Sequence, residues 1–412
     1  MSIPTGPYAA LRLPDFRLFV SARFCITLAI QIQGVVVAWQ VYDLTHDPLS
    51  LGFIGLAEAI PSIGVSLYAG HIADIVQRKK IILICVSTLL LCSLALLSFT
   101  LDVGSAILQY GVLSIYSVIF LSGIARGFLT PALFAYMPQL IPRELYSNAI
   151  TWNSTLWETA AIGGPAVGGL LYSIYGVRAS YAADVALMIL GLLLALAVTN
   201  KPLPPESEEQ GMLEKIKAGL RFVFSNQIIL GAISLDLFAV LFGGAVALLP
   251  IFAKDILHAG PIALGLLRAA PSVGALMMAF YITHYPIRRN MGTILLYCVA
   301  GFGVCMILFA LSENLLLSLS LLMISGMFDC VSVIIRGTLL QTLTPENMKG
   351  RVSAVNHIFI GSSNEIGMFE SGVAARLLGV VRSVIFGGCM TLISVGVIGG
   401  LAKSLRKLQR LQ

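Results

Sequence analysis

The sequence has few charged residues for its length. Only 11% of its 412 residues are Asp, Glu, Lys or Arg, less than half of the roughly 25% that is typical of a soluble globular chain. Hydrophobic residues make up 58% of the sequence, and the mean hydropathy is +0.91. A soluble fold cannot bury so much apolar surface, and a disordered chain needs the opposite composition. The composition therefore excludes both classes and indicates an integral membrane protein.

The motifs of several catalytic classes are also missing. The sequence contains no G-x4-G-K-[ST] phosphate loop, which excludes ATP hydrolysis by a P-loop as the source of energy. It has no H-E-x-x-H or G-x-S-x-G string, and no two of its five histidines have the spacing of metal ligands. We therefore expect no enzyme activity, no bound metal and no cofactor.

Cysteine usage excludes a disulfide framework and a zinc site. There are seven cysteines, an odd number, and none forms a C-x-x-C pair. All of them fall in apolar stretches, at positions 25, 85, 92, 298, 305, 330 and 389. Free cysteine behaves as a small apolar side chain. The sequence therefore predicts seven buried thiols.

Long apolar runs fill most of the chain, and about 20 such residues suffice for a helix to cross a bilayer. The predicted spans are 18–42, 50–73, 81–101, 108–136, 149–175, 179–199, 227–252, 259–283, 291–311, 314–341, 352–378 and 381–403. Only the connector 200–226 stands out, with three prolines, an acidic cluster and an amphipathic stretch around Met212–Phe224. We predict an all-α polytopic protein of twelve transmembrane helices. Its expected parts are a six-helix bundle (1–199), a cytoplasmic linker with an interfacial helix (200–226), and a second six-helix bundle with a basic tail (227–412).

The positive charges predict the orientation in the membrane. No cleavable signal peptide is visible in the short polar segment before the first span, so we expect a cytoplasmic N-terminus. With that end inside, 18 of the 26 Lys and Arg residues lie on the inner side, 4 on the outer side and 4 within spans. This follows the positive-inside rule and predicts two cytoplasmic termini. The net charge of +6 then needs no nucleic-acid partner.

Ionisable residues inside the spans are the main functional candidates. An ionised group facing lipid at the midplane costs about 2.5–3.5 kcal/mol on insertion scales. Such groups must therefore face a wet cavity, pair with one another, or lie near the interface, and pairing for assembly alone is an open alternative. If the protein carries protons across the membrane, Glu58, Asp236 and Asp329 are the carrier candidates by depth. The full set is Glu58, Arg126, Glu158, Asp236, Arg268, Asp329, Arg336, Glu365 and Glu370.

The end of the second span carries the string Gly70-His-Ile-Ala-Asp74-Ile-Val-Gln-Arg78-Lys79. Gly70 and Asp74 are four residues apart and share a helix face. Glycine permits close helix approach, and a carboxylate can meet an arginine or a helix N-terminus. The string therefore predicts a latch that opens and closes during transport. An ordinary topogenic loop would explain the two cations but neither Gly70 nor Asp74.

This string resembles the cytoplasmic signature of the major facilitator superfamily, G-x-x-x-D-x-x-G-R-[RK], with Gln77 in place of the second glycine. A weaker copy follows span eight and keeps Arg288 and Arg289, with His284 where the acid would be. The resemblance implies that spans one, four, seven and ten line a central pathway. The pathway candidates are then Gln31, Gln33, Arg126, Asp236, Asp329 and Arg336. Arg126 could equally support the Asp74 latch, so we also include it among the gating candidates.

Span five contains Gly164-Pro165-Ala-Val-Gly168-Gly169, which is similar to the end of a pattern found in exporters of this superfamily. The upstream glycines of that pattern are replaced by Thr151 and Ala160. Gly164 and Gly168 permit close helix packing, and Pro165 permits bending.

Further segments in both halves are similar to the bacterial enterobactin-exporter-like branch of the superfamily. They are Ala22–Phe24, Trp39–His46, Leu339–Glu346 and Gly350–Ala354. We therefore expect a monomeric secondary transporter of the bacterial inner membrane that exports a small amphiphilic molecule, siderophore-like or drug-like, by proton antiport and alternating access. Import, uniport, or a non-transporting receptor or assembly factor are the alternatives.

Overall fold

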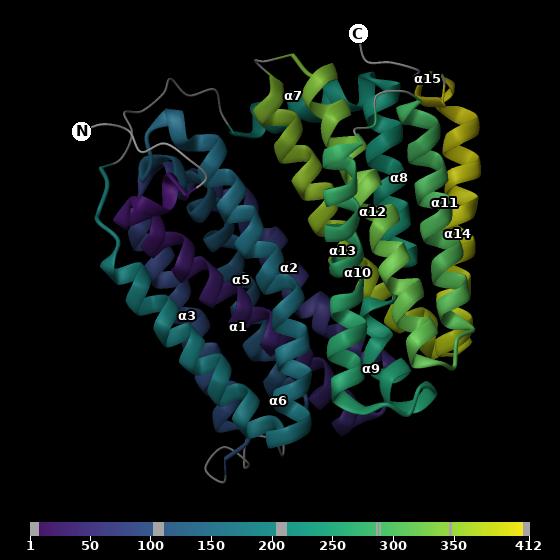
Figure 1. Ribbon diagram of the computed structural model, residues 1–412, viewed down its shortest axis with the longest axis horizontal. Coiled ribbons are helices and arrows are strands. Elements are labelled where there is room, and N and C mark those ends of the chain that lie inside the picture. Colours follow the sequence, from purple (N-terminus) through teal and green to yellow (C-terminus); the bar gives the residue numbers. More distant parts are fainter. Residues whose placement is uncertain are drawn as a thin grey trace. The chain divides into compact units, whose positions relative to one another are not determined.

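The computed structural model describes residues 8–101, 111–202, 212–285, 287, 290–345 and 348–406. Over these ranges the chain is helical apart from short connections (Figure 1). The chain divides into two compact units. Unit 1 comprises Met1–His46, Ala57–Ser207 and Gly260–Gly265, and unit 2 comprises Asp47–Leu56, Glu208–Ala259 and Leu266–Gln412. The expected boundaries at 199 and 226 stay a prediction.

Unit 1 is built from long helices and short 3-10 turns of the N-terminal half of the chain. They are η1 (Ala10–Arg12), α1 (Pro14–Thr45), most of α2 (Pro48–Ile75), α3 (Arg78–Ser98), α5 (Leu113–Tyr136), η2 (Met137–Gln139), η3 (Arg143–Leu145) and α6 (Tyr146–Ala197). Pro14 opens α1, where its missing N–H and its φ suit the first helical turn. α1 packs along α6, and α3 packs against both α5 and α6 (Figure 1).

α6 contains two predicted spans. It runs for 52 residues, or about 78 Å at 1.5 Å per residue, more than twice the ~30 Å of a bilayer core. Gly176 interrupts it with φ 79° and ψ −178°, a conformation that is open to glycine and costly for other residues. The interruption falls between the predicted spans 149–175 and 179–199, so α6 consists of two helices that match these two spans.

Unit 2 contains the remaining helices, except for Gly260–Gly265 of α10, and the short α15 at the end of the described chain. They are α7 (Met212–Ser225), α8 (Gln227–Gly243), η4 (Ala245–Leu248), α9 (Leu249–Ile251), η5 (Phe252–Ile256), α10 (Gly260–His284), α11 (Met291–Ala310), α12 (Leu315–Leu343), α13 (Lys349–Leu378), α14 (Val380–Leu401) and α15 (Lys403–Arg406). The Asn226 and Asn314 side chains accept hydrogen bonds from the first free N–H groups of α8 and α12. These two caps define where both helices begin.

The predicted span 227–252 coincides with the apolar helical segment Gln227–Ile256, but the helix changes type within it. α8 ends at Gly243 and continues as a 3-10 turn, a short α-helix and a π-helical turn up to Ile256. Two adjacent glycines, Gly243 and Gly244, weaken the helix, and Pro250 cannot donate a backbone hydrogen bond. Hydropathy alone does not register these breaks, because the segment stays apolar throughout.

Ten of the described helical segments are long and apolar enough to cross a membrane. One of these, Asn148–Ala197, contains two predicted spans that are joined at Gly176. α13 is 30 residues long but more polar, and is not among the ten. The all-α polytopic class is therefore confirmed, and the helices are consistent with twelve crossings.

α7 occupies the segment in which the sequence predicts an amphipathic helix. Its Val223 is fully buried and packs in a cluster with Ile229 and Ile233 of α8 and with Val352 and Val355 of α13. α7 is therefore held to unit 2 by its apolar side. Its predicted place at a membrane interface remains a prediction.

The prediction of seven buried thiols is wrong for Cys389. All seven cysteines are free; five are buried, Cys330 is half-buried and Cys389 is exposed. Cys389 lies on α14 near Phe386, Ile393 and Val397, whose side chains are also exposed. In a membrane helix the surface that faces lipid is as apolar as the surface that faces the core, so apolar neighbours do not imply burial.

Candidate functional site

In unit 1 an arginine and a carboxylate from two spans form an ion pair. Arg126 of α5 contacts Glu58 of α2, and the two side chains are about one quarter exposed. Gly123 and Gly127 explain the approach of the helices: a Cβ on Gly123 would lie 2.6 Å from the Glu58 carbonyl oxygen, and one on Gly127 would lie 3.0 Å from that of Ser62. The two glycines bring α5 against the α2 backbone, which places Arg126 beside Glu58.

Unit 2 contains a second and more deeply buried pair. Asp236 of α8 contacts Arg336 of α12, with only 8% and 5% of their side chains exposed. Asp329 lies two turns earlier on α12, is itself exposed, and interacts electrostatically with both members of the pair. The structure therefore pairs two of the predicted pathway residues and places a third two turns away on the same helix.

The sequence analysis missed a buried acid in unit 1. Asp184 of α6 is fully buried, and its Oδ2 accepts a hydrogen bond from Nε2 of Gln33 on α1 at 3.2 Å. The same Gln33 amide lies 3.3 Å from Ser93 Oγ of α3. Asp184 lies inside the apolar run 179–199, just as Asp236 lies inside the run 227–252. The rule that identifies Asp236 as a candidate therefore also identifies Asp184.

The two cations of the span-two string bind helix C-termini within unit 1. Arg78 donates to the Ala135 carbonyl of α5 at 2.9 Å. Lys79 donates to the carbonyls of Leu196 and Val198 at the end of α6, at 2.8 and 2.5 Å. The last carbonyls of a helix lack partners within the helix and carry partial negative charge, so cations are favourable there. These residues therefore tie the start of α3 to the ends of α5 and α6.

Other predicted gating residues cannot be placed in the same way. Gly70 and Asp74 belong to α2, but their side-chain surroundings lie outside the described residues, so the latch stays a prediction. Arg288 and Arg289 of the weaker copy also lie outside the described residues. Arg126, for which two roles were open, pairs with Glu58.

The glycines of span five lie in α6 against α1. Gly164 approaches Gln31 so closely that a Cβ would collide with the Gln31 side chain, and a Cβ on Gly168 would lie 3.2 Å from the Ile32 Cα. Pro165 lies inside α6 between them, and Gly169 follows directly. The α1–α6 contact that carries Gln31 and Gln33 therefore depends on small residues of α6.

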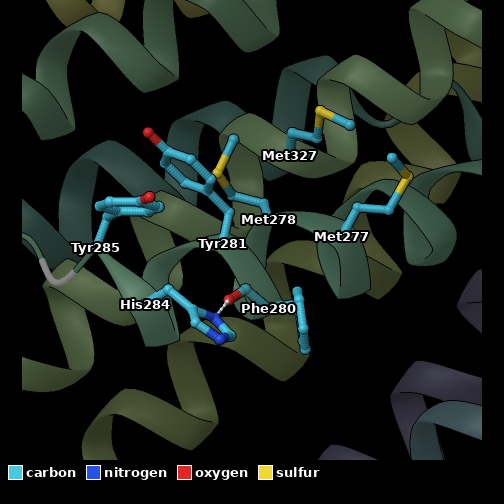
Figure 2. A pocket seen from close by; sticks show the side chains of 7 residues that line it. All are labelled: Met277, Met278, Phe280, Tyr281, His284, Tyr285 and Met327. Atoms are coloured by element: carbon cyan, nitrogen blue, oxygen red, sulfur yellow. Dashed lines mark hydrogen bonds between the residues drawn. The ribbon is translucent and has the colours of Figure 1, made fainter.

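A largely apolar pocket of about 500 Å³ lies at the end of α10 near α12 (Figure 2). Its lining residues are Met277, Met278, Phe280, Tyr281, His284, Tyr285 and Met327. Figure 2 shows Met278 and Tyr281 on the side of Met327, while His284 turns toward its own helix, with Nδ1 3.0 Å from the Phe280 carbonyl. Methionines adapt to irregular apolar ligands, and tyrosines add polar ends to aromatic faces. The pocket therefore offers an apolar lining with a few polar ends.

Two helical units with ionisable residues inside apolar spans are typical of secondary transporters with the major facilitator fold. The family model of the transmembrane secretion effectors matches residues 5–411. The chain therefore belongs to this family of the major facilitator superfamily and handles a small-molecule substrate.

Individual relatives agree with this family. The chain is 28% identical over 345 residues to the enterobactin exporter EntS of Shigella dysenteriae serotype 1. The aligned residues cover 83% of this chain and 80% of the relative. Among solved structures, a POT family transporter in complex with a thioalcohol conjugated peptide has a TM-score of 0.74 at 13% identity, covering 95% of this chain and 96% of that chain. A bacterial homologue of the iron transporter ferroportin in an inward-facing state has a TM-score of 0.71 at 16% identity, covering 96% and 99%. These structural similarities show the fold alone.

Proposed function

We propose that the protein exports a small amphiphilic, siderophore-like molecule across the bacterial inner membrane in exchange for protons, by alternating access. The observation that carries the proposal is the buried Asp236–Arg336 pair with Asp329 beside it. A structural bundle has no need of a second acid near a paired arginine, whereas a carrier needs an acid whose countercharge can move.

The coupling step follows from the cost of burying charge. While Arg336 contacts Asp236, the carboxylate keeps its charge. When Arg336 turns toward Asp329 or toward an acidic group of the substrate, Asp236 is left buried without a countercharge. An isolated buried carboxylate is costly, so it takes up a proton. Return of Arg336 then expels the proton, and the access of the site to each side of the membrane sets the direction of flow.

The Arg126–Glu58 pair supplies a similar arrangement in unit 1, with both side chains partly exposed. Its greater exposure lowers the cost of separating the two charges compared with the pair in unit 2. We therefore assign coupling first to Asp236, with Glu58 and Asp329 as the other candidates.

The substrate class rests on the pocket at α10 and on the relatives that are named enterobactin exporters. Enterobactin is accordingly the first compound to test. The protein is proposed to act as a monomer in the lipid bilayer.

Energised inside-out vesicles that contain the full-length chain test the proposal. Enterobactin added outside should accumulate inside, and a pH-sensitive dye should report proton release from the acidic lumen. The Asp236→Asn variant should show neither response at equal expression. Accumulation only in right-side-out vesicles would indicate import, and accumulation without proton movement would indicate uniport. Absence of movement across a panel of siderophores and lipophilic cations would favour the receptor or assembly role.

The proposed topology makes a separate prediction. A cysteine introduced at Ser207, in the linker, should react with a membrane-impermeant maleimide only from the cytoplasmic side. A cysteine at Tyr175, which is 68% exposed beside the Gly176 turn, should react only from the outside. Labelling is measured in intact and in permeabilised cells, with the unaltered chain as background. Reversed labelling of the two positions would invert the proposed orientation.

A further inference from the structure

Polar side chains form a line along the α1–α6 contact of unit 1. On α1, Gln33, Gln40 and Asp43 are separated by seven and three residues, so they lie on one face. On α6, Asp184 and Tyr181 are three residues apart. Polar groups aligned on two facing membrane helices need a reason, because each is costly in an apolar interface.

Hydrogen bonds join α1 to α6 at three levels of this line. Gln33 donates to Asp184 at 3.2 Å. Tyr181, which is fully buried, donates from Oη to Gln40 Oε1 at 2.6 Å. Tyr172 Oη and Asp43 Oδ2 are 3.5 Å apart in a partly buried environment near the end of α1. The polar groups therefore extend from the buried acid toward that end of α1, which is the outer side in the predicted topology.

Asp184 differs from the in-span acids that pair with arginine. Its carboxyl is fully buried, and its Oδ1 has no hydrogen-bond partner among the described residues. The groups that donate to it, the Gln33 amide and the Ser93 hydroxyl, are neutral. Among the described residues, the titratable groups that interact with it are Tyr181 on α6 and Cys92 on α3, and neither is a cation.

An ionised carboxylate with an unpaired oxygen in such a place would bear the full cost of desolvation. A neutral carboxylic acid avoids that cost. The environment therefore favours a carboxyl that carries its proton in this conformation.

We propose that Asp184 is a proton-binding site that exchanges its proton with the outer side along the line of Tyr181, Gln40, Tyr172 and Asp43. The carboxylic acid releases H⁺ and becomes a carboxylate, and the reverse step restores the acid without any other reactant. Gln33 links the site to the predicted pathway, because the same amide contacts Asp184 and lies on α1. A change in the charge of Asp184 changes the strength of the hydrogen bond that it accepts from Gln33. The Gln33 side chain, which belongs to the predicted pathway, then reorients.

The role of the site in transport rests on the proposed proton coupling, but the binding of a proton by Asp184 does not. Infrared spectroscopy of the full-length protein in liposomes measures that binding directly. A carboxylic-acid C=O band that is absent in Asp184→Asn should be present at neutral pH, disappear as the pH rises, and shift in D₂O. Lack of such a band, or a band that neither titrates nor exchanges, would overturn the proposal.

The route has its own matched pair of variants. Tyr181→Phe removes one hydroxyl from the line and should slow deuterium exchange of the Asp184 band several-fold. Tyr175→Phe removes an exposed hydroxyl from the same helix and should leave the rate unchanged. Equal rates in both variants would contradict the route through Tyr181.

A second variant covers the case in which Asp184→Asn fails to fold. Ser93→Ala removes a donor to the carboxyl and should move the same band to a different frequency, whereas a band from another acid would not move. Because no substrate is used, these outcomes are independent of the enterobactin experiment. If enterobactin is not transported but the Asp184 band titrates, the proposed substrate is wrong and this site stands. If enterobactin is transported but no Asp184 band titrates, this site is wrong and the proposed substrate stands.

Discussion

Arg336→Gln should abolish proton-coupled transport and strongly destabilise the protein. The change leaves Asp236, whose side chain is 8% exposed, buried without its countercharge. Removing one partner of a buried ion pair costs about 3–5 kcal/mol, because the remaining charge is uncompensated. The loss should be smaller at acid pH, since a protonated Asp236 no longer needs the arginine. The melting temperature of the purified protein at several pH values measures the effect.

Two further variants separate folding from coupling at this pair. Asp236→Asn combined with Arg336→Gln removes both charges and should recover most of the lost stability, but no proton movement. Arg382→Gln removes an exposed arginine of α14 in the same unit and should change neither quantity. A single Arg336→Gln variant that keeps full stability and full coupling would refute the role assigned to the buried pair.

Gly123→Ala should have the second large effect, although it adds only a methyl group. The new Cβ would lie 2.6 Å from the backbone oxygen of Glu58 and 2.8 Å from Pro61, so α5 must move away from α2. Overpacking of this kind typically costs about 1–3 kcal/mol. The displacement also moves Arg126 relative to Glu58, so we expect a marked loss of transport at normal expression.

Gly163→Ala is the matched control for this change. Gly163 lies in α6, also in unit 1, and a Cβ there would meet no atom within 4 Å. The Gly163→Ala variant should have the same melting temperature and the same transport activity as the unaltered chain. If both alanine variants behave alike, close approach of α5 to α2 does not govern the Arg126–Glu58 contact.

Several features could be predicted from local properties of the chain. Span positions follow from apolar runs, and the ends of α10, α11 and α12 differ by only one or two residues from the predicted ranges. Asp236 and Arg336 were recognisable because ionisable residues are rare inside such runs. Asp184 carries the same signal, because it too lies inside an apolar run.

The partners of these residues could not be predicted. Helical spacing placed Asp329 and Arg336 on one face of α12, but the contact that Arg336 makes is with Asp236 on α8. In the same way Arg126 was considered as support for Asp74 or as a pathway residue, and the structure pairs it with Glu58. Each contact joins residues that are at least 68 positions apart in the chain. Helical periodicity relates only residues within one helix, so it cannot predict such contacts.

The amino-acid sequence by itself determined that the chain enters a bilayer, where its helices cross, and which residues are too polar to face lipid. These properties depend on the free energy of transferring each segment from water into the bilayer, and this free energy is additive along the chain. Tertiary structure alone decided which acid meets which arginine, which acid is left without one, and where glycines let two backbones touch. Those outcomes depend on packing between distant helices, and packing energies arise only when the helices meet.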